Sequence, residues 1–293
     1  FIEQFSKVTS KAALAASYLV GKKDKIAADQ AAVDSMRSEL NKINMIGKVV
    51  IGEGTLDEAP LLYTGEFLGT KNGPSFDIAV DPVEGTNFVA YNHPGGISVL
   101  AIGEKGNLFN APETYMDKLA VGKDVPDDAT DLDFPIEKNI KNIADFKNKK
   151  LSDITVCLLD RPRHKEIIEK LKKLKVKLKL LSDGDVSGAL MVTDVKYDTD
   201  IFIGIGGGPE GVLAASALDA FKCKFEGRFL FNSEKDINRA KKMGIRDLNK
   251  KYKLNEIIKG DSIFCATGIT NSEILKGIDI NENKYSSETL VTH

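Results

Sequence analysis

Histidine, cysteine and tryptophan are scarce in this chain, and each scarcity excludes a kind of site. The 293 residues include three histidines, three cysteines and no tryptophan. A zinc site built from several histidines is therefore not expected, and any bound metal should be a hard cation held by oxygen atoms. Cys157, Cys223 and Cys265 lie far apart and form no C-x-x-C pair, which predicts reduced, partly buried thiols of an intracellular protein.

Two further absences limit the partners of the chain. Lysine and arginine number 41 against 43 aspartate and glutamate residues, a net charge of −2, so nothing favours nucleic acid or an anionic membrane surface. No apolar run approaches the ~18 residues of a membrane-spanning helix. We expect a cytoplasmic protein whose partner is a small molecule, with no nucleic acid and no membrane. A removed targeting segment would leave no trace in a chain that begins with Phe1.

Hydrophobic spacing predicts an α/β fold with two subdomains. In the first half, a helix is expected at 24–44, ending before Gly47, with strands at 48–51, 76–80 and 96–103. The second half repeats strand, loop and helix, with strands at 154–159, 176–181, 201–205 and 262–266 and helices at 165–174, 186–195 and 212–221. The polar segment 126–150 is interpreted as the connection. The expected subdomains are residues 1–136, of α+β type, and residues 137–293, of α/β type.

Charged or glycine-rich loops follow the predicted strands of the second half and read DRPRH, SDGD and GGGPE. Ligands of α/β sheets bind beyond the carboxyl ends of the strands, so these loops mark the expected site. Arg161 and Arg163 suit a phosphate group, which a guanidinium binds bidentately, although an exposed basic helix start would look the same. Asp183 and Asp185 form either an ordinary turn or a site for sugar hydroxyls.

Acidic residues also follow apolar strands: Glu53, Asp57 and Glu58 after 48–51, Asp81 and Glu84 after 76–80, and Glu210 after 201–205. Any one of them alone would be a solvated turn or helix-start residue. Several together would repel, since two carboxylates roughly 4 Å apart repel by about 4 kcal/mol at an effective dielectric constant of about 20. A converging cluster needs a cation or raised pKa values, and magnesium or manganese suits oxygen ligands and phosphate. Thr86 is either the N-cap of 87–91 or a group that positions an attacking water, and the two roles are compatible.

The stretch GIGGGPEG matches a different motif as well. Gly206, Gly208 and Gly211 fit G-x-G-x-x-G after a strand, and Glu226 lies about 20 residues further on, as in a dinucleotide-binding fingerprint. Two features oppose that interpretation. Glu210 would place a negative charge where the pyrophosphate should sit, and the motif lies late in the chain.

Seven motifs in order carry a resemblance that covers nearly the whole chain, from about Phe5 to Val291. They are GEGTLDEAPLLYTGE, DPVEGT, NAPETYMDKL, RPRH, SDGDV, GIGGGPEGV and ATGIT. Together they resemble the class II fructose-1,6-bisphosphatases, some of which also hydrolyse sedoheptulose 1,7-bisphosphate. The resemblance implies the layered α/β sandwich of the lithium-sensitive sugar phosphatases, with the active site between two subdomains. It also implies magnesium or manganese as cofactor, a sugar bisphosphate as substrate, and a homo-oligomer, either dimer or tetramer.

The resemblance also implies a role for each matching residue. The metal ligands would be Asp29, Glu53, Asp81, Glu84 and Glu210. Asp57 and Thr86 would position and activate the attacking water, with Glu84 as the third catalytic residue. The substrate would be held by Glu84, Gly85, Thr86, Tyr115, Arg161, Arg163, Asp183, Asp185 and Gly207. Asp29 is assigned by the resemblance alone, because it lies within a helical pattern.

Two departures and three competing hypotheses accompany the resemblance. Arg161 stands where relatives often have lysine, and the segment between Arg228 and Met243 is about a dozen residues shorter than expected. An inositol-type monophosphatase shares the D-P-x-[DE]-G-T pattern, but its late W-D motif requires a tryptophan, which this chain lacks. A nicotinamide-dependent oxidoreductase and a non-enzymatic acidic cation-binding protein are the second and third hypotheses. We predict metal-dependent hydrolysis of the 1-phosphate of fructose 1,6-bisphosphate.

Overall fold

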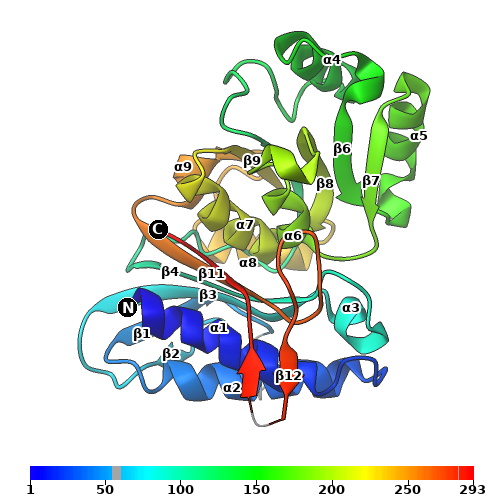
Figure 1. Cartoon of the computed structure of the whole chain (residues 1–293). Coiled ribbons are helices and arrows are strands. Elements are labelled where there is room, and N and C mark those ends of the chain that lie inside the picture. The colour runs from blue at the N-terminus through cyan, green and yellow to red at the C-terminus, as the bar shows by residue number, and fades with distance from the viewer. Residues whose placement is uncertain (55–60, 283) are drawn as a thin grey trace. The chain divides into compact units, whose positions relative to one another are not determined.

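In the part of the chain that the structure describes, residues 1–54, 61–282 and 284–293, strand pairing forms two units, each with one six-stranded mixed sheet (Figure 1). The structure is a computed structural model. The first unit comprises Phe1–Ala111 and Ile257–His293, and the second comprises Pro112–Glu256. Each unit layers helices against its sheet, which confirms the predicted α/β class.

The first unit packs two long helices on a sheet of order β14-β11-β4-β3-β1-β2. Its helices are α1 (Ile2–Ser17), α2 (Lys25–Leu40) and α3 (Thr86–Tyr91), and its sheet strands are β1 (Ile46–Ile51), β2 (Phe67–Leu68), β3 (Ser75–Glu84), β4 (Ile97–Glu104), β11 (Ser262–Gly268) and β14 (Thr289–Thr292). Strands β12 (Asp279–Asn281) and β13 (Lys284–Ser286) pair separately. Strand β1 runs parallel to β3, whereas β4 runs antiparallel to β3. The carboxyl ends of β1 and β3 therefore lie at one edge.

The second unit has the sheet order β10-β9-β5-β8-β6-β7. Its strands are β5 (Tyr115–Val121), β6 (Thr155–Leu159), β7 (Lys177–Leu181), β8 (Ile201–Gly207), β9 (Lys224–Leu230) and β10 (Lys251–Lys253). Its helices are α4 (Ile136–Phe146), α5 (Lys165–Leu174), α6 (Asp185–Leu190), α7 (Gly208–Ala220), α8 (Glu234–Lys242) and α9 (Leu254–Ile257), with short 3₁₀ turns at Leu151–Asp153, Pro162–His164 and Val195–Tyr197. Strands β6, β7 and β8 are parallel to one another, and β5 runs antiparallel to β8.

The division between the units differs from the predicted boundary at residue 136. Strand β11 pairs with β4 in the register Phe264↔Ala101, which returns the end of the chain to the first unit. Strand β5, absent from the sequence prediction, lies between β8 and β9 in the second sheet. Residues 112–136 therefore belong to the second unit and 257–293 to the first, because strand pairing joins segments that are distant in sequence.

Several predicted elements change their bounds. The first predicted helix ends at Leu40, and Gly47 lies inside β1. The polar segment 126–150, predicted to be a connection, contains α4, whose Ile136, Ile140 and Ile143 join the second core. The helix predicted at 186–195 ends at Leu190. The polar composition of α4 concealed it because only one stripe of the helix faces the core.

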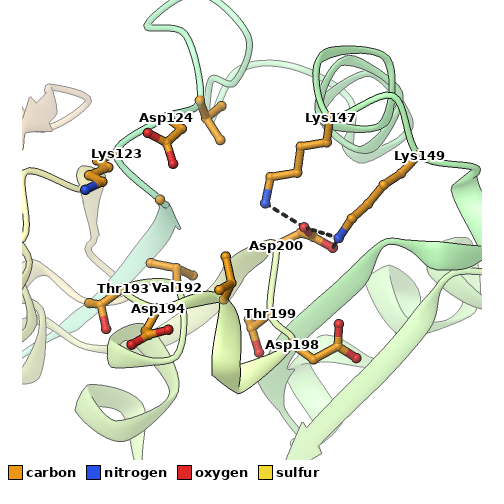
Figure 2. Close-up of a pocket in the computed structure, with 13 residues that line it drawn as sticks. Lys123, Asp124, Lys147, Lys149, Val192, Thr193, Asp194, Asp198, Thr199 and Asp200 are labelled. Atoms are coloured by element: carbon orange, nitrogen blue, oxygen red, sulfur yellow. Dashed lines mark hydrogen bonds and ion pairs between the residues drawn. The ribbon is translucent and has the colours of Figure 1, made fainter.

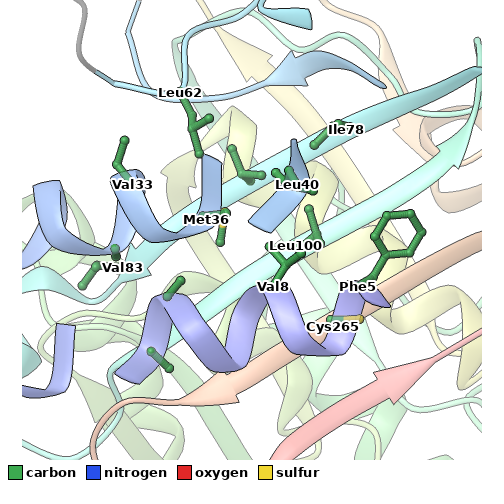
Figure 3. Close-up of a cluster of buried hydrophobic side chains, with 14 of the residues drawn as sticks. Phe5, Val8, Val33, Met36, Leu40, Leu62, Ile78, Val83, Leu100 and Cys265 are labelled. Atoms are coloured by element: carbon green, nitrogen blue, oxygen red, sulfur yellow. The ribbon is translucent and has the colours of Figure 1, made fainter. Parts of the chain in front are cut away.

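The core of the first unit lies between the helix pair and the sheet (Figure 3). It joins Phe5 and Val8 of α1, Val33, Met36 and Leu40 of α2, Ile78 of β3, Leu100 of β4 and Cys265 of β11. Helix α2 begins at an Asp24 N-cap, whose carboxylate accepts a hydrogen bond from Ala27 N at 2.9 Å. This cap and the buried stripe fix the helix that carries Asp29.

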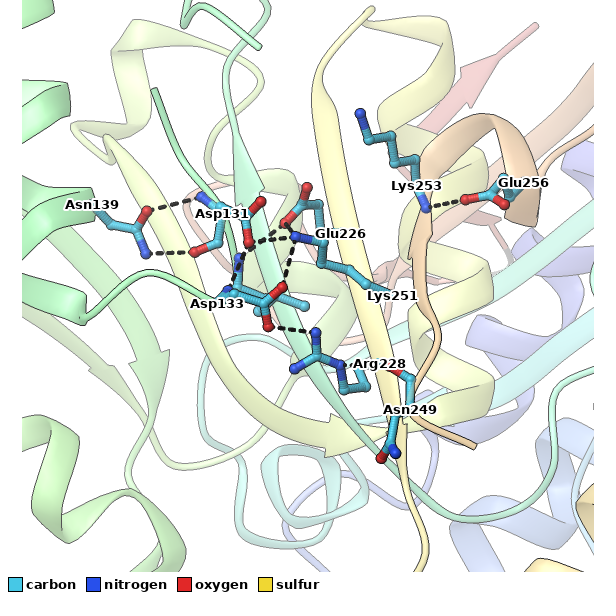
Figure 4. A network of polar contacts seen from close by, with 10 residues as sticks. Asp131, Asp133, Asn139, Glu226, Arg228, Asn249, Lys251, Lys253 and Glu256 are labelled. Atoms are coloured by element: carbon cyan, nitrogen blue, oxygen red, sulfur yellow. Dashed lines mark hydrogen bonds and ion pairs between the residues drawn. The ribbon is translucent and has the colours of Figure 1, made fainter. Parts of the chain in front are cut away.

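A polar network attaches the segment before α4 to the edge of the second sheet (Figure 4). Lys251 of β10 pairs with Asp131 and Asp133, and Arg228 of β9 also pairs with Asp133. Glu226 accepts a hydrogen bond from Leu132 N at 2.9 Å. Glu226, the acid of the apparent dinucleotide fingerprint, is therefore part of a structural network.

The three cysteines are buried and free. Among the described residues, no helix combines the length and the apolar character that a bilayer crossing requires.

The packing of α2 gives a test of the first core. Met36 is 0% exposed, so Met36→Ala should lower the free energy of unfolding by about 2–5 kcal/mol. Ile26 lies in the same helix but is 83% exposed, so Ile26→Ala should change it by less than about 0.5 kcal/mol. Urea unfolding followed by circular dichroism measures both variants. Equal losses would contradict this orientation of α2.

Candidate active site

The carboxylates of the first unit lie where β1 and β3 end. Glu53 follows β1, and the parallel register Ile51↔Ala79 directs it toward the end of β3, which contains Asp81. The stretch DPVEGT is not simply a turn beyond the strand, as its sequence suggested. Strand β3 continues to Glu84, and its pairing with β4 shifts between Asp81 and Glu84, so that one extra residue re-aims the acidic side chains.

Gly85 is required by the turn that follows. Its φ of +81° lies in the left-handed region, and a Cβ there would come within 2.6 Å of the Phe88 ring. Gly85 is also the N-cap of α3, and Thr86 is its first residue. The predicted N-cap role of Thr86 is therefore wrong. Its role toward water stays a prediction.

Asp29 of α2 meets Glu53 in a side-chain hydrogen bond. Burial raises the pKa of Asp29 to about 6, and the contact with Glu53 opposes that shift. Its Oδ1 atom is buried without a hydrogen-bond partner among the described residues. Sequence reasoning alone placed Asp29 on an ordinary helix face, and only the contact with Glu53 relates it to the strand ends.

A divalent cation suits this group of carboxylates. A buried carboxylate oxygen that accepts no hydrogen bond is stabilised by a hard cation, and oxygen is the ligand that magnesium and manganese prefer. Within the described ranges, no three His, Cys, Asp or Glu side chains form a group that could hold a metal. Asp57 and Glu58 lie outside these ranges, and Glu210 belongs to the second unit. The complete ligand set therefore stays a prediction.

The candidate substrate residues of the second unit share one edge of its sheet. Parallel strands β6, β7 and β8 end at this edge and are followed by Arg161 and Arg163, by Asp183 and Asp185, and by the glycines that lead to Glu210. Tyr115 begins the antiparallel strand β5 opposite Gly207. The strand ends therefore bring together the loops of Arg161, Asp183 and Gly207, as the alternation of strands and helices predicted, and Tyr115 joins them through β5, which was not predicted.

The two arginines are held by protein contacts. Arg161 Nη2 donates to Asp183 Oδ1 at 3.1 Å. The Arg163 guanidinium carbon lies 4.8 Å from the ring centroid of Tyr115, and Arg163 Nε donates to Ile205 O at 2.7 Å. Stacking on an aromatic ring and a backbone hydrogen bond orient the guanidinium plane, which favours bidentate binding of an anion.

His164 lies directly beneath this loop, and sequence reasoning assigned it no role. It is buried, its Nδ1 lies 2.6 Å from Leu159 O, and its Nε2 accepts a hydrogen bond from Ile205 N at 2.7 Å. Since Nε2 is an acceptor, the ring is neutral and carries its proton on Nδ1. His164 thus connects the end of β6 to Ile205, whose carbonyl oxygen also binds Arg163.

Lys118 is the second residue that sequence reasoning missed. It lies on the face of β5 that contains Met116 and Ala120, and only 1% of its surface is exposed. Its Nζ pairs with Asp185 Oδ2 and donates to Gly207 O at 2.6 Å. The sequence did contain a signal for Lys118, namely a lysine at an inward position of an apolar strand. A lysine is rarely buried without a partner.

Glu210 in the first turn of α7 lies close to this lysine. Burial raises the pKa of Glu210, and the positive charge of Lys118 opposes that shift. Its Oε2 atom is buried and accepts no hydrogen bond among the described residues. Like Asp29, it is a carboxylate whose environment suits a cation.

A cavity of about 390 Å³ adjoins these residues within the second unit. It is lined by Glu113, Thr114, Tyr115, Gly207, Pro209, Glu210, Asn232 and Asp236. A separate cavity of about 360 Å³ contains none of the candidate residues (Figure 2). Burial raises the pKa of Asp200, which lines this second cavity. Hydrogen bonds from Lys147, Thr155 N and Lys149 together have the larger effect, so the net shift is to a lower pKa. These ion pairs satisfy the Asp200 charge, which distinguishes it from Asp29 and Glu210.

Carboxylates that suit a divalent cation and arginines that suit a phosphate group are what a metal-dependent phosphatase requires. Comparison with known proteins specifies the family. The chain belongs to the family described as "Bacterial fructose-1,6-bisphosphatase, glpX-encoded", whose model matches residues 1–293.

Curated relatives agree with this assignment. "Fructose-1,6-bisphosphatase 1 class 2" of Escherichia coli (strain K12) is 40% identical over 302 residues, covering 98% of this chain and 89% of the relative. A class 2 fructose-1,6-bisphosphatase of Haemophilus influenzae is 41% identical over 98% of this chain and 90% of the relative. A Synechococcus relative (strain JA-2-3B'a(2-13)), 39% identical over 97% of this chain and 89% of its own length, is named "D-fructose 1,6-bisphosphatase class 2/sedoheptulose 1,7-bisphosphatase". A solved inositol monophosphatase from Anabaena (Nostoc) sp. PCC 7120 aligns with 66% of this chain and 70% of its own, at 14% identity and a TM-score of 0.34, which supports no inference.

The neutral state of His164 predicts a pH dependence of stability. Burial lowers the pKa of His164 below its ordinary value of 6.5, so the unfolded chain binds the proton more readily. The contribution of His164 should be complete above about pH 6.5 and should be lost as the pH falls toward the folded-state pKa. Urea unfolding of the wild type and His164→Gln at pH 7.5 and 5.5 measures it. The difference between the two proteins should shrink at pH 5.5, and a difference that grows there would contradict the neutral tautomer.

Proposed function

We propose that this chain hydrolyses the 1-phosphate of fructose 1,6-bisphosphate, with magnesium or manganese, to give fructose 6-phosphate. Membership of the family over the whole chain is the observation that carries the proposal. The strand-end carboxylates, the oriented arginines and the cavity beside Tyr115 and Gly207 support it. Because the Synechococcus relative carries both enzyme names, sedoheptulose 1,7-bisphosphate is the second substrate to test.

The residues would divide the work as follows. Asp29, Glu53, Asp81, Glu84 and Glu210 would hold the cations, which when bound lower the pKa of water and offset the charge of the reacting phosphate. Asp57 and Thr86 would orient the attacking water, and Asp57 would accept its proton.

Arg161 and Arg163 would bind the distal phosphate. That binding would hold the reacting phosphate in place for attack. Tyr115, Asp183, Asp185 and Gly207 would contact the sugar, together with the backbone of Gly85 and Thr86. We also propose a role in gluconeogenesis, a cytoplasmic location and a homo-oligomeric state, which the resemblance implies.

The glycine-rich loop disfavours a dinucleotide-binding role. A Cβ at Gly207 would lie only 1.8 Å from Glu210 Oε2, so the carboxylate lies directly against the turn that a pyrophosphate would occupy. A pyrophosphate at a helix N-terminus requires the absence of such a charge. The loop therefore supports a cation-binding role for Glu210.

Phosphate release gives the direct test. The wild type should release phosphate from fructose 1,6-bisphosphate with magnesium or manganese, and EDTA should abolish the release. Glu84→Gln should reduce kcat by orders of magnitude, since the neutral amide is a poorer cation ligand. Glu104→Gln, at an exposed glutamate of the same unit, is the control and should retain full rate. A near-normal rate of Glu84→Gln at saturating metal would refute the role of this carboxylate.

Arg163 gives a test of distal-phosphate binding. Arg163→Ala should raise KM for the bisphosphate by about 10- to 100-fold, the value of a charge-assisted hydrogen bond. Arg246→Ala, at an exposed arginine of the same unit, should leave KM unchanged. Steady-state kinetics with fructose 1,6-bisphosphate and fructose 1-phosphate measure the effect. An equal loss on the monophosphate, which lacks the distal group, would contradict the assignment.

A further inference from the structure

Lys118 is a buried charge that the proposed reaction does not yet use. Strand β5 places it on the inner face of the sheet, between Met116 and Ala120, where 1% of its surface is exposed. Removing an ammonium group from water is unfavourable by several kcal/mol unless partners offset it. The structure supplies those partners from two loops at the candidate active site.

The Lys118 ammonium joins segments that are far apart in sequence. It pairs with Asp185 Oδ2 at the start of α6 and donates to Gly207 O at the end of β8, 2.6 Å away. Its charge also acts on Glu210 in the first turn of α7. One side chain thus contacts or influences two proposed substrate residues and one proposed metal ligand.

Stability alone does not account for a lysine at this position. A buried ion pair contributes little net stability compared with apolar side chains of the same volume. A positive charge near the N-terminus of α7 is also unfavourable, because the helix dipole there is positive. Met116, the neighbour on the same face, shows that an unbranched apolar side chain fits this layer.

We propose, on the basis of the function proposed above, that Lys118 is a positioning residue for the substrate site. By binding Asp185 Oδ2, it fixes the carboxylate so that Oδ1 is the oxygen available to a sugar hydroxyl. By binding Gly207 O, it fixes the peptide that borders the cavity. Its charge also offsets the carboxylates of Asp185 and Glu210, which would otherwise repel an anionic sugar phosphate.

Product binding without metal tests this role independently of turnover. Isothermal calorimetry with fructose 6-phosphate in EDTA would compare the wild type, Lys118→Met, Lys118→Arg, Asp185→Asn and the double variant Lys118→Met/Asp185→Asn. Lys118→Met should raise Kd by about tenfold, the effect of losing one charge-assisted contact, and Lys118→Arg should restore part of the affinity. The loss of affinity caused by Lys118→Met should be smaller in the Asp185→Asn background than in the wild type, because Lys118 acts partly through Asp185.

A matched control separates positioning from structure. Lys179 of β7 is also partly buried and donates to Tyr197 O at 2.7 Å, away from the site, so Lys179→Met should leave Kd unchanged. Thermal unfolding of every variant records the structural effect. An unchanged Kd in folded Lys118→Met, whatever its melting temperature, would overturn the proposal.

If Lys118→Met fails to fold, the double variant decides, since it removes both charges of the Lys118–Asp185 pair. A Kd that exceeds that of Asp185→Asn by the full effect of about tenfold or more would then refute action through Asp185, and a smaller rise would support it. Fructose 6-phosphate binding by a wild type that releases no phosphate would contradict the proposed function alone. A wild type that releases phosphate but does not bind fructose 6-phosphate would overturn the positioning proposal alone.

Discussion

The close approach of two carboxylates to the backbone at the end of β8 is the constraint on which the second unit's site depends. Asp185 Oδ2 and Glu210 Oε2 each lie 1.8 Å from the position that a Cβ would take at Gly206 and Gly207. Any side chain there would expel a carboxylate, so glycine is required by packing. The glycines of GIGGGPEG therefore make room for acids of the protein itself, whereas the same spacing in a dinucleotide fold makes room for a bound phosphate.

The partners of a buried charge distinguish structural positions from candidate functional ones. Asp200 is surrounded by two lysines and a backbone N–H, so its charge is satisfied within the fold. Asp29 and Glu210 each retain a buried carboxylate oxygen that accepts no hydrogen bond in the described part of the chain. A folded protein tolerates such a group where a bound ligand supplies the missing partner, so perturbed carboxylates favour a cation site. The charge of Lys118 offsets part of the charge of Glu210.

Local sequence patterns predicted the loops, and long-range strand pairing determined which side chains contact them. Arg163, Asp183 and Asp185 were predicted because each follows an apolar strand, and a strand is visible over five or six residues. The partners of these residues were not predictable in this way. Lys118 lies in β5, whose place between β8 and β9 depends on pairing across about 90 and 110 residues. The return of β11 to the first sheet escaped prediction for the same reason.

The basic loop shows how such pairing orients the side chains of a candidate site. Arg163 stacks on Tyr115 of β5 and binds the Ile205 carbonyl of β8, while His164 binds Leu159 of β6 and the Ile205 N–H. Both groups of Ile205 are thus committed to adjacent residues of one loop. Protonation of His164 would place a hydrogen on Nε2, where it would face the Ile205 N–H and break that hydrogen bond. Ile205, whose carbonyl binds Arg163, would then be held less firmly. Since an oriented guanidinium loses less entropy on binding phosphate, the neutral imidazole would aid the proposed anion binding without touching the anion.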